Sequence, residues 1–384
     1  MPVITPGRSI KILLTLGCLF AFTRTGQPSD PVGDFVNAYM RDHQIPGCAI
    51  MVRDNGNVIT KAYGKANLEH DVDVTPQTLF QSGSVGKQFT AMAVMLLVEG
   101  RQLSLDDPVS KYLDVPKSWS GIKVRHLLTH TSGLGDYPKW ITYQENYDEN
   151  GLLNIIKKQP LSFKPGEGFK YSNLGYATLG ILIHAVSGEF YGDLLQRRVF
   201  GPLAMKHTRI INEDDIIPNR AAGYVLDNNC ALKNQGWVSP TFNTTADGTL
   251  YFTVEDLAKW DEALDTEKLV SHASLEQMWT PFKPKNNCDS RYGFGWFICN
   301  LDSEHRLLWH YGKWQGFSAY IARYPEYRLT VAVLCNLYDV ETGYVAEHIA
   351  GMYNRALASP ALAKTQPSNS DTDKTSRHSD SRRR

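Results

Sequence analysis

The sequence predicts a mixed α/β (α+β) fold, in which an antiparallel sheet is built from the two ends of the chain and flanked by helices. β-like runs lie over residues 47–64 and again over residues 292–334. The long segment between them mixes helices with loops rich in glycine and proline. Strands at both ends with helices between them imply that the terminal segments meet in one sheet, with the mostly helical middle inserted on one face.

The elements follow from local patterns along the chain. Helices are predicted over residues 31–43, 84–99, 176–186, 254–264 and 340–357, and strands over 47–53, 58–64, 292–299, 306–309, 317–324 and 329–334. Asn55-Gly56 between the first two strands is a strong hairpin signal, and Gly100 ends the second helix. We therefore expect a sheet subdomain from residues 28–75 and 290–357 and a mostly helical subdomain from residues 76–289.

The composition is that of a globular protein. The 384 residues are 42% hydrophobic and 21% charged, with 40 basic and 40 acidic side chains and a formal net charge of zero. These values exclude a largely disordered, collagen-like or coiled-coil chain. A chain without net positive charge is not expected to bind nucleic acid.

Residues 1–26 have the pattern of a secretory signal peptide. Arg8 and Lys11 precede an uncharged, mostly apolar run over residues 12–22, about half of what spans a bilayer as a helix. We expect an exported protein, periplasmic or secreted, with no integral membrane span after signal removal. A membrane anchor or a buried N-terminal helix is the alternative. Cys18 matches a lipoprotein cleavage box only faintly, so a lipid anchor is less favoured.

The C-terminal segment, residues 358–384, is predicted to be a disordered basic tail. It consists mainly of small, polar and charged residues and ends in three arginines. Such a segment lacks the apolar side chains that offset the entropy of ordering. Binding to nucleic acid or to an anionic surface is the alternative to a solvated tail.

Cysteine usage excludes both a dense disulfide framework and a cysteine-rich zinc site. Signal removal leaves Cys48, Cys230, Cys288, Cys299 and Cys335, an odd number without a Cys-x-x-Cys pair. Cys288 could form one bridge, with either Cys230 or Cys299, and the sequence does not decide between them.

A Ser-x-x-Lys motif, Ser84 to Lys87, is the first candidate for catalysis. It lies at the start of the apolar helix predicted over residues 84–99, where both side chains share a face and the helix N-terminus supplies unpaired N–H groups. Such a pair can activate a serine and stabilise an oxyanion. Ser120 and Lys123 have the same spacing, but they lie in a loop without that setting.

Several other site types are absent from the sequence. There is no His-Glu-x-x-His and no Gly-x-Ser-x-Gly. The segment around Lys87 is not a phosphate-binding loop, because Gln81 and Gln88 stand where glycine and serine or threonine belong. Two further motifs are each the only one of their kind in the sequence: the Tyr-x-Asn of Tyr171-Ser172-Asn173 and the His-x-Gly of His310-Tyr311-Gly312.

Ser-x-x-Lys, Tyr-x-Asn and His-x-Gly in this order resemble the serine β-lactamase and penicillin-binding-protein superfamily. The closer resemblance is to its branch of class C β-lactamase-like esterases and D-peptidases. Four more stretches are similar to that branch: Leu105 to Pro108, Leu127 to Leu134, Gly201 to Leu203 and Tyr292 to Trp296. The resemblance covers about residues 30–353 and implies a β-lactamase/transpeptidase-like fold.

The resemblance also implies roles for the motif residues. Ser84 would be the nucleophile that forms an acyl-enzyme, and Lys87 and Tyr171 would share its proton as a coupled pair. Asn173 would orient Lys87 or the substrate amide. His310 would contact the substrate or Tyr171. No metal or cofactor is implied.

The third motif would also supply much of the substrate site. The backbone N–H groups of Ser84 and Lys313 would form the oxyanion hole, and Gly312 and Trp314 would contact the substrate. Trp314 and Phe317 suggest an apolar wall near the acyl group, and the alternative for either residue is a place in the core.

This third motif departs from the Lys-Thr-Gly of true β-lactamases and many carboxypeptidases. That lysine attracts a substrate carboxylate, whereas His310 offers a weaker and pH-dependent charge, which Lys313 could partly restore. We therefore expect a serine hydrolase that cleaves an ester or small amide, carboxylesterase-like first, with a small molecule or peptide as its partner. The alternatives are a D-stereospecific peptidase or DD-carboxypeptidase, a weak β-lactamase and, among non-enzymes, an inactive acyl-sensor relative.

Overall fold

The computed structural model describes residues 30–240, 245–285 and 291–358. The predicted signal peptide, Cys288 and the predicted tail from residue 359 lie outside these ranges, so what was predicted for them stays a prediction. Within the described residues, no helix is both long enough and apolar enough to cross a membrane.

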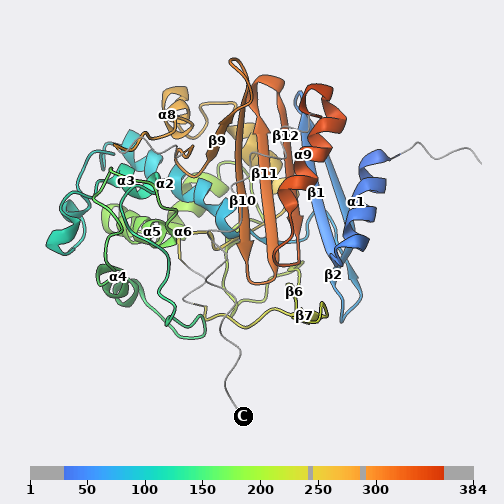
Figure 1. Ribbon diagram of the computed structural model, residues 1–384, viewed down its shortest axis with the longest axis horizontal. Helices are drawn as coiled ribbons and strands as arrows, with labels where there is room; N and C mark the ends of the chain where they lie inside the picture. Colours follow the sequence, from blue (N-terminus) through green and yellow to red (C-terminus); the bar gives the residue numbers. More distant parts are fainter. Residues whose placement is uncertain (1–29, 241–244, 286–290, 359–384) are drawn as a thin grey trace, which may run out of the picture.

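A seven-stranded antiparallel sheet, in the order β3-β2-β1-β12-β11-β10-β9, forms the centre of the fold (Figure 1). Its strands are β1 Gly47–Asp54, β2 Asn57–Asn67, β3 Val72–Asp73, β9 Phe297–Asn300, β10 Arg306–Trp314, β11 Phe317–Tyr324 and β12 Leu329–Cys335. Strand β1 pairs with β12, from Cys48 opposite Cys335 to Asp54 opposite Leu329. The prediction that the two ends of the chain meet in one antiparallel sheet is confirmed.

Alternation along the central strands divides the interior into two cores. In β1, Ile50 and Val52 point to one face of the sheet, and Ala49 and Met51 point to the other. Two helices from opposite ends of the chain, α1 Pro31–Asp42 and α9 Thr342–Tyr353, contact each other and cover the first face (Figure 1).

The second core lies between the other face of the sheet and the inserted helical segment. Its helices are α2 Lys87–Glu99, α3 Val124–Leu128, α4 Glu149–Lys157, α5 Asn173–Ser187, α6 Tyr191–Leu195, α7 Val254–Ala263 and α8 His272–Met278. Two small sheets, β4-β8-β5 and β6-β7, use strands β4 Phe80–Gln81, β5 Arg209–Ile210, β6 Tyr224–Leu226, β7 Leu232–Asn234 and β8 Leu250–Phe252. Every residue of α2 from 87 to 97 is buried, so this helix is the central support of the inserted segment.

Several element boundaries differ from the sequence prediction, and hydrogen bonds explain two of the differences in the C-terminal strands. The strand predicted from residue 292 begins only at Phe297, because Gly293 donates its N–H to the Trp296 carbonyl and turns the chain. Strand β10 continues five residues beyond the predicted end at residue 309, because β11 pairs with it as far as Trp314 opposite Phe317.

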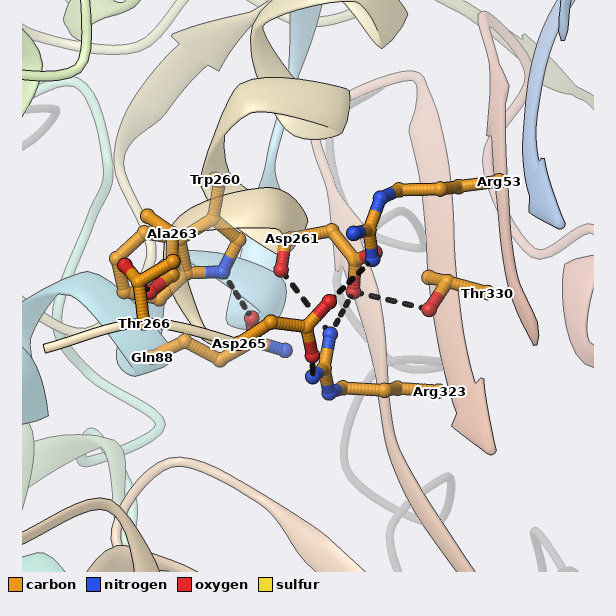
Figure 2. A network of polar contacts seen from close by, with 9 residues as sticks. All are labelled: Arg53, Gln88, Trp260, Asp261, Ala263, Asp265, Thr266, Arg323 and Thr330. Atoms are coloured by element: carbon orange, nitrogen blue, oxygen red, sulfur yellow. Dashed lines mark hydrogen bonds and ion pairs between the residues drawn. The ribbon is translucent and has the colours of Figure 1, made fainter. Parts of the chain in front are cut away.

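A buried network of charges fastens α7 to the sheet (Figure 2). The Asp261 carboxylate of α7 is ion-paired with Arg53 of β1 at 3.0 Å and with Arg323 of β11. Thr330 of β12 donates its hydroxyl to the same carboxylate at 2.9 Å. Asp265 pairs with both arginines, so two cations face two carboxylates.

Candidate active site

Ser84 and Lys87 come from two consecutive elements rather than one helix. Ser84 lies in a single 3-10 turn, η1 Gly83–Gly86, and Lys87 is the first residue of α2. The helix predicted over residues 84–99 therefore begins three residues later. Both residues stay at the N-terminal end of a buried helix, where backbone N–H groups lack intrahelical partners.

Lys87 is fully buried and makes three polar contacts through its Nζ atom. Nζ lies 2.9 Å from the Ser84 Oγ and 2.7 Å from the Asn173 Oδ1, and it also contacts the carbonyl oxygen of Asp247. Burial lowers the pKa of Lys87 to about 8, against the opposing charges of Asp247 and Asp136. A substantial fraction of Lys87 is thus a neutral amine near pH 8.

The partners of Lys87 determine where a neutral amine points its lone pair. The Asn173 amide oxygen and the Asp247 carbonyl can only accept hydrogen bonds, so they take the two amine hydrogens. The lone pair is then left for the Ser84 hydroxyl. Asp136 holds Asn173 in this orientation, because its carboxylate accepts from the Asn173 Nδ2 at 3.0 Å.

The start of α5 positions both residues of the Tyr-x-Asn motif. Ser172 caps the helix by accepting from the Gly175 N–H at 2.8 Å, and it donates its hydroxyl to the Gly135 carbonyl at 2.7 Å. Its own N–H is bonded to the Nδ1 of the buried His130 at 3.0 Å. Tyr171 and Asn173 are therefore held on either side of a residue with fixed backbone and side chain.

Tyr171 lies beside Lys87 with its ring facing the amine. The Lys87 Nζ is 5.0 Å from the ring centroid. Burial raises the pKa of Tyr171 well above its usual value of 10. The nearby Ser84 hydroxyl acts to lower this pKa, although the geometry of the two groups is not that of a hydrogen bond. Tyr171 is therefore a neutral phenol in the resting site, and Lys87 is the member of the pair that titrates near neutrality.

His310 lies inside β10, fully buried, and its ring is held from both sides. Its Nδ1 is 2.6 Å from the Tyr311 carbonyl oxygen and its Nε2 is 2.9 Å from the Tyr292 hydroxyl. Burial and the nearby Lys87 lower the pKa of His310 to about 3. The expected pH-dependent charge is corrected accordingly: the ring is neutral, with its N–H donated to the carbonyl and its other nitrogen accepting from Tyr292. It makes no hydrogen bond to Tyr171.

The backbone of β10 passes directly against the turn that carries Ser84. A Cβ on Gly312 would stand 2.1 Å from the Ser82 carbonyl oxygen and 3.0 Å from the Ser84 nitrogen. A Cβ on Gly83, whose φ is +47°, would stand 2.5 Å from the Lys313 nitrogen. Only glycine permits this approach, which brings together the two N–H groups predicted to form the oxyanion hole.

The side chains that follow the third motif have separate partners. The Lys313 ammonium is ion-paired with Asp339. Trp314 is half-buried against Tyr143, with 5.4 Å between ring centroids. Phe317 is buried in the core against Phe80, which is the alternative that the sequence left open for it.

Some residues of the site carried no assigned role in the sequence. His130 and Tyr292 belong to stretches that support the family resemblance. Their ring centroids lie 4.4 Å apart at an interplanar angle of 54°, and the His130 ring centroid is 4.2 Å from that of Tyr171. Asp136 and Asp247 stand in no motif, and only the fold brings them to Lys87. A motif search finds residues that stand at a fixed spacing in the sequence. Asp136 and Asp247 lie in loops whose distance from Lys87 along the chain follows no such rule.

The second Ser-x-x-Lys does not form a comparable site. Ser120 is exposed, and the Lys123 Nζ is ion-paired with Asp106 at 3.0 Å. Among the described residues, no three His, Cys, Asp or Glu side chains gather as they would around a metal ion.

Comparisons with known proteins agree with this fold. The model of the beta-lactamase family matches residues 32–350. Penicillin-binding protein 4* of Bacillus subtilis is 31% identical over 331 residues, which are 80% of this chain and 72% of that protein. The octameric penicillin-binding protein homologue from Pyrococcus abyssi has a TM-score of 0.74 at 30% identity, covering 84% of this chain and 76% of its own. The match to the penicillin-binding protein from Bacillus halodurans has a TM-score of 0.75 at 27% identity and covers 83% of this chain and 99% of that chain.

Proposed function

The chain belongs to the beta-lactamase family, whose members are serine hydrolases, and we propose that it cleaves an ester or small amide through an acyl-enzyme on Ser84. The observation that carries this proposal is the 2.9 Å contact between the Ser84 Oγ and the buried Lys87 Nζ. A lysine whose pKa is about 8 can act as a base on an otherwise weak nucleophile.

In the first half of the reaction, the neutral Lys87 takes the Ser84 proton while Oγ attacks the substrate carbonyl carbon. The backbone N–H groups of Ser84 and Lys313 stabilise the resulting oxyanion. Tyr171, a neutral phenol beside both groups, donates a proton to the leaving group and recovers one from Lys87. Water then hydrolyses the ester on Ser84 by the same steps in reverse.

An uncharged substrate fits the charges around the third motif. His310 is neutral because its pKa is lowered to about 3, and the Lys313 ammonium is already paired with Asp339. Neither side chain therefore offers a free positive charge to a substrate carboxylate. This supports a carboxylesterase-like activity ahead of β-lactam or C-terminal peptide cleavage.

A second candidate function is reaction of Ser84 with penicillin or a D-amino-acid peptide. It is favoured by the 31% identical relative from Bacillus subtilis, which is named as a penicillin-binding protein. An acyl-sensor would differ from an enzyme in forming the Ser84 adduct without releasing it. We further propose that the protein is exported, on the basis of the signal pattern in residues 1–26.

Substrate profiling with matched serine variants tests the proposal. Short-chain nitrophenyl esters, D-alanyl peptides and a chromogenic cephalosporin are compared for turnover. Ser84→Ala is expected to abolish hydrolysis while the protein remains folded, and Ser120→Ala, the control with the same motif spacing, is expected to retain full activity. Retained activity in Ser84→Ala would overturn the assignment of the nucleophile.

Mass spectrometry separates the enzyme from the sensor. A fluorophosphonate or penicillin adduct on the peptide that contains Ser84 is expected in either case. Release of the penicilloyl or acyl group within the time of an ester assay indicates an enzyme, whereas a stable adduct with every substrate indicates a sensor.

A further inference from the structure

Two cysteines from opposite ends of the chain lie side by side at the centre of the sheet. Cys48 of β1 stands directly opposite Cys335 of β12. Both belong to the core beneath α1 and α9, so both thiols point to the same face of the sheet. The two residues are 2% and 1% exposed.

The hydrogen-bond pattern gives the spacing of this pair. The Asn336 N–H donates to the carbonyl of Gly47, its opposite residue, at 3.2 Å. Hydrogen-bonded and non-hydrogen-bonded pairs alternate along antiparallel strands, so Cys48 and Cys335 form a non-hydrogen-bonded pair. In such pairs the Cα atoms lie about 4.5 Å apart and the side chains approach most closely. Disulfides span Cα distances of about 4.4–6.8 Å, so this pair falls inside the range without strand movement.

We propose that Cys48 and Cys335 form a cross-strand disulfide when the chain meets a disulfide donor such as oxidised glutathione or a thiol–disulfide oxidoreductase. The thiolate of one cysteine attacks a sulfur of the donor and expels one donor thiol. The second cysteine attacks the mixed disulfide and expels the other. Two electrons pass from the protein thiols to the donor, and the two protons end on the released thiols.

The buried position of the two cysteines determines at which stage they are oxidised and how the disulfide affects stability. The contact with Cys48, together with burial, raises the pKa of the Cys335 thiol, so the folded reduced protein reacts slowly and the bond forms most readily during folding. The bond would join the N-terminal strands to the last strand across almost the whole inserted segment. A disulfide that closes so long a loop constrains the unfolded chain strongly.

Thiol counting on the purified full chain tests the proposal. The reduced protein is unfolded in urea and refolded with oxidised glutathione, then denatured, alkylated and mapped as peptides. We expect a cross-linked peptide pair containing Cys48 and Cys335, two fewer alkylations, and a Tm about 5 °C or more above that of the reduced protein. Full alkylation of both residues, a bridge from either to another cysteine, or a lower Tm after oxidation would overturn the proposal.

Variants and labelling kinetics supply the controls. In the folded reduced protein, the exposed Cys230 is expected to be alkylated at least 100-fold faster than Cys48 or Cys335, as their burial requires. Cys230→Ser should leave the bridge and the Tm shift unchanged. Cys48→Ser and Cys335→Ser should each abolish the dependence of Tm on oxidation. If a serine variant fails to fold, the peptide map of the unaltered chain still decides the question.

Discussion

Lys87 and Arg323 are both buried cations, but their surroundings give them opposite chemistry. Burial lowers the pKa of Lys87 to about 8, because Asp247 and Asp136 compensate only in part. Burial would also lower the pKa of Arg323, but the adjacent carboxylates of Asp261 and Asp265 outweigh it and raise the pKa. The arginine stays charged throughout the range of an enzyme assay, whereas the lysine can lose its proton near pH 8.

The difference shows that the two clusters are built for different tasks. In the network around Arg323, shown in Figure 2, each cation faces carboxylates, and the result is a fixed connection between α7 and the sheet. In the active site, Lys87 is surrounded mainly by neutral oxygen acceptors. Lys87, whose positive charge is only partly balanced by neighbouring carboxylates, is the cation that can take part in proton transfer.

Lys87→Met gives the largest expected effect, because it removes the proposed base while keeping a side chain of similar size. We expect kcat/KM for an ester to fall by about 1,000-fold or more. The pKa of Lys87, lowered from 10.5 to about 8, corresponds to about 3 kcal/mol of unfavourable burial of the charge, which the substitution relieves. The lost hydrogen bonds offset that gain, so the free energy of unfolding should change by only about 1 kcal/mol. Ester kinetics and urea unfolding measure both quantities.

Lys87→Arg is the control for this prediction, since it keeps a charge that cannot be removed. It should be as inactive as Lys87→Met but less stable, because the guanidinium remains charged and larger in the same space. Activity in Lys87→Arg above that of Lys87→Met would show that Lys87 acts through its charge rather than as a base.

Asp261→Asn is expected to have the next largest effect, on stability rather than chemistry. It leaves the buried Arg323 and the partly buried Arg53 with only Asp265 as a full countercharge, and breaking a buried pair from one side costs about 3–5 kcal/mol. Thermal and urea unfolding measure the loss. At a temperature where the variant is folded, kcat should stay within about twofold of the unaltered protein.

Asp265→Asn is the matched control, because it removes the same charge from the same arginines at a side chain that is 44% exposed. Its stability loss should be clearly smaller, since water replaces the missing partner. Equal losses in the two variants would mean that burial does not determine the strength of this network.

The sequence predicted the parts of the molecule that depend on short, regular patterns. We could infer the hairpin at Asn55-Gly56 and the pairing of the terminal strands, because turn chemistry and strand alternation act over a few residues. The three motifs could be read directly, because each is a short pattern of neighbouring residues. The same local signals predicted that Ser84 and Lys87 lie at the N-terminal end of a helix, although Ser84 is in the turn that precedes α2.

The charges of the site could not be predicted in the same way, because they depend on contacts between distant loops. His310 looked like a titratable group, but Tyr292 and the Tyr311 carbonyl hold it as a buried neutral ring. Asp247, in a loop far along the chain, determines part of the pKa of Lys87. No spacing rule connects such residues, so only the folded chain shows which of them face each other.

The pH dependence of ester hydrolysis gives the smallest and most specific test of the difference between the two cations. Attack by Ser84 needs neutral Lys87, so kcat/KM for an uncharged ester should rise about tenfold per pH unit below the pKa and level off above about pH 8. His310, with a pKa of about 3, and Tyr171, with a pKa well above 10, add no step between pH 5 and 9. Rates are corrected with Ser84→Ala at each pH.

Asp247→Asn then shifts this profile in a direction that the electrostatics determine. The Asp247 carboxylate raises the pKa of Lys87, so removing its charge should move the midpoint to lower pH. Asp265→Asn, which changes only the distant network, should leave the midpoint where it is. A rate that is flat from pH 6 to 9, or a midpoint that Asp247→Asn moves upward, would mean that a group other than Lys87 accepts the Ser84 proton.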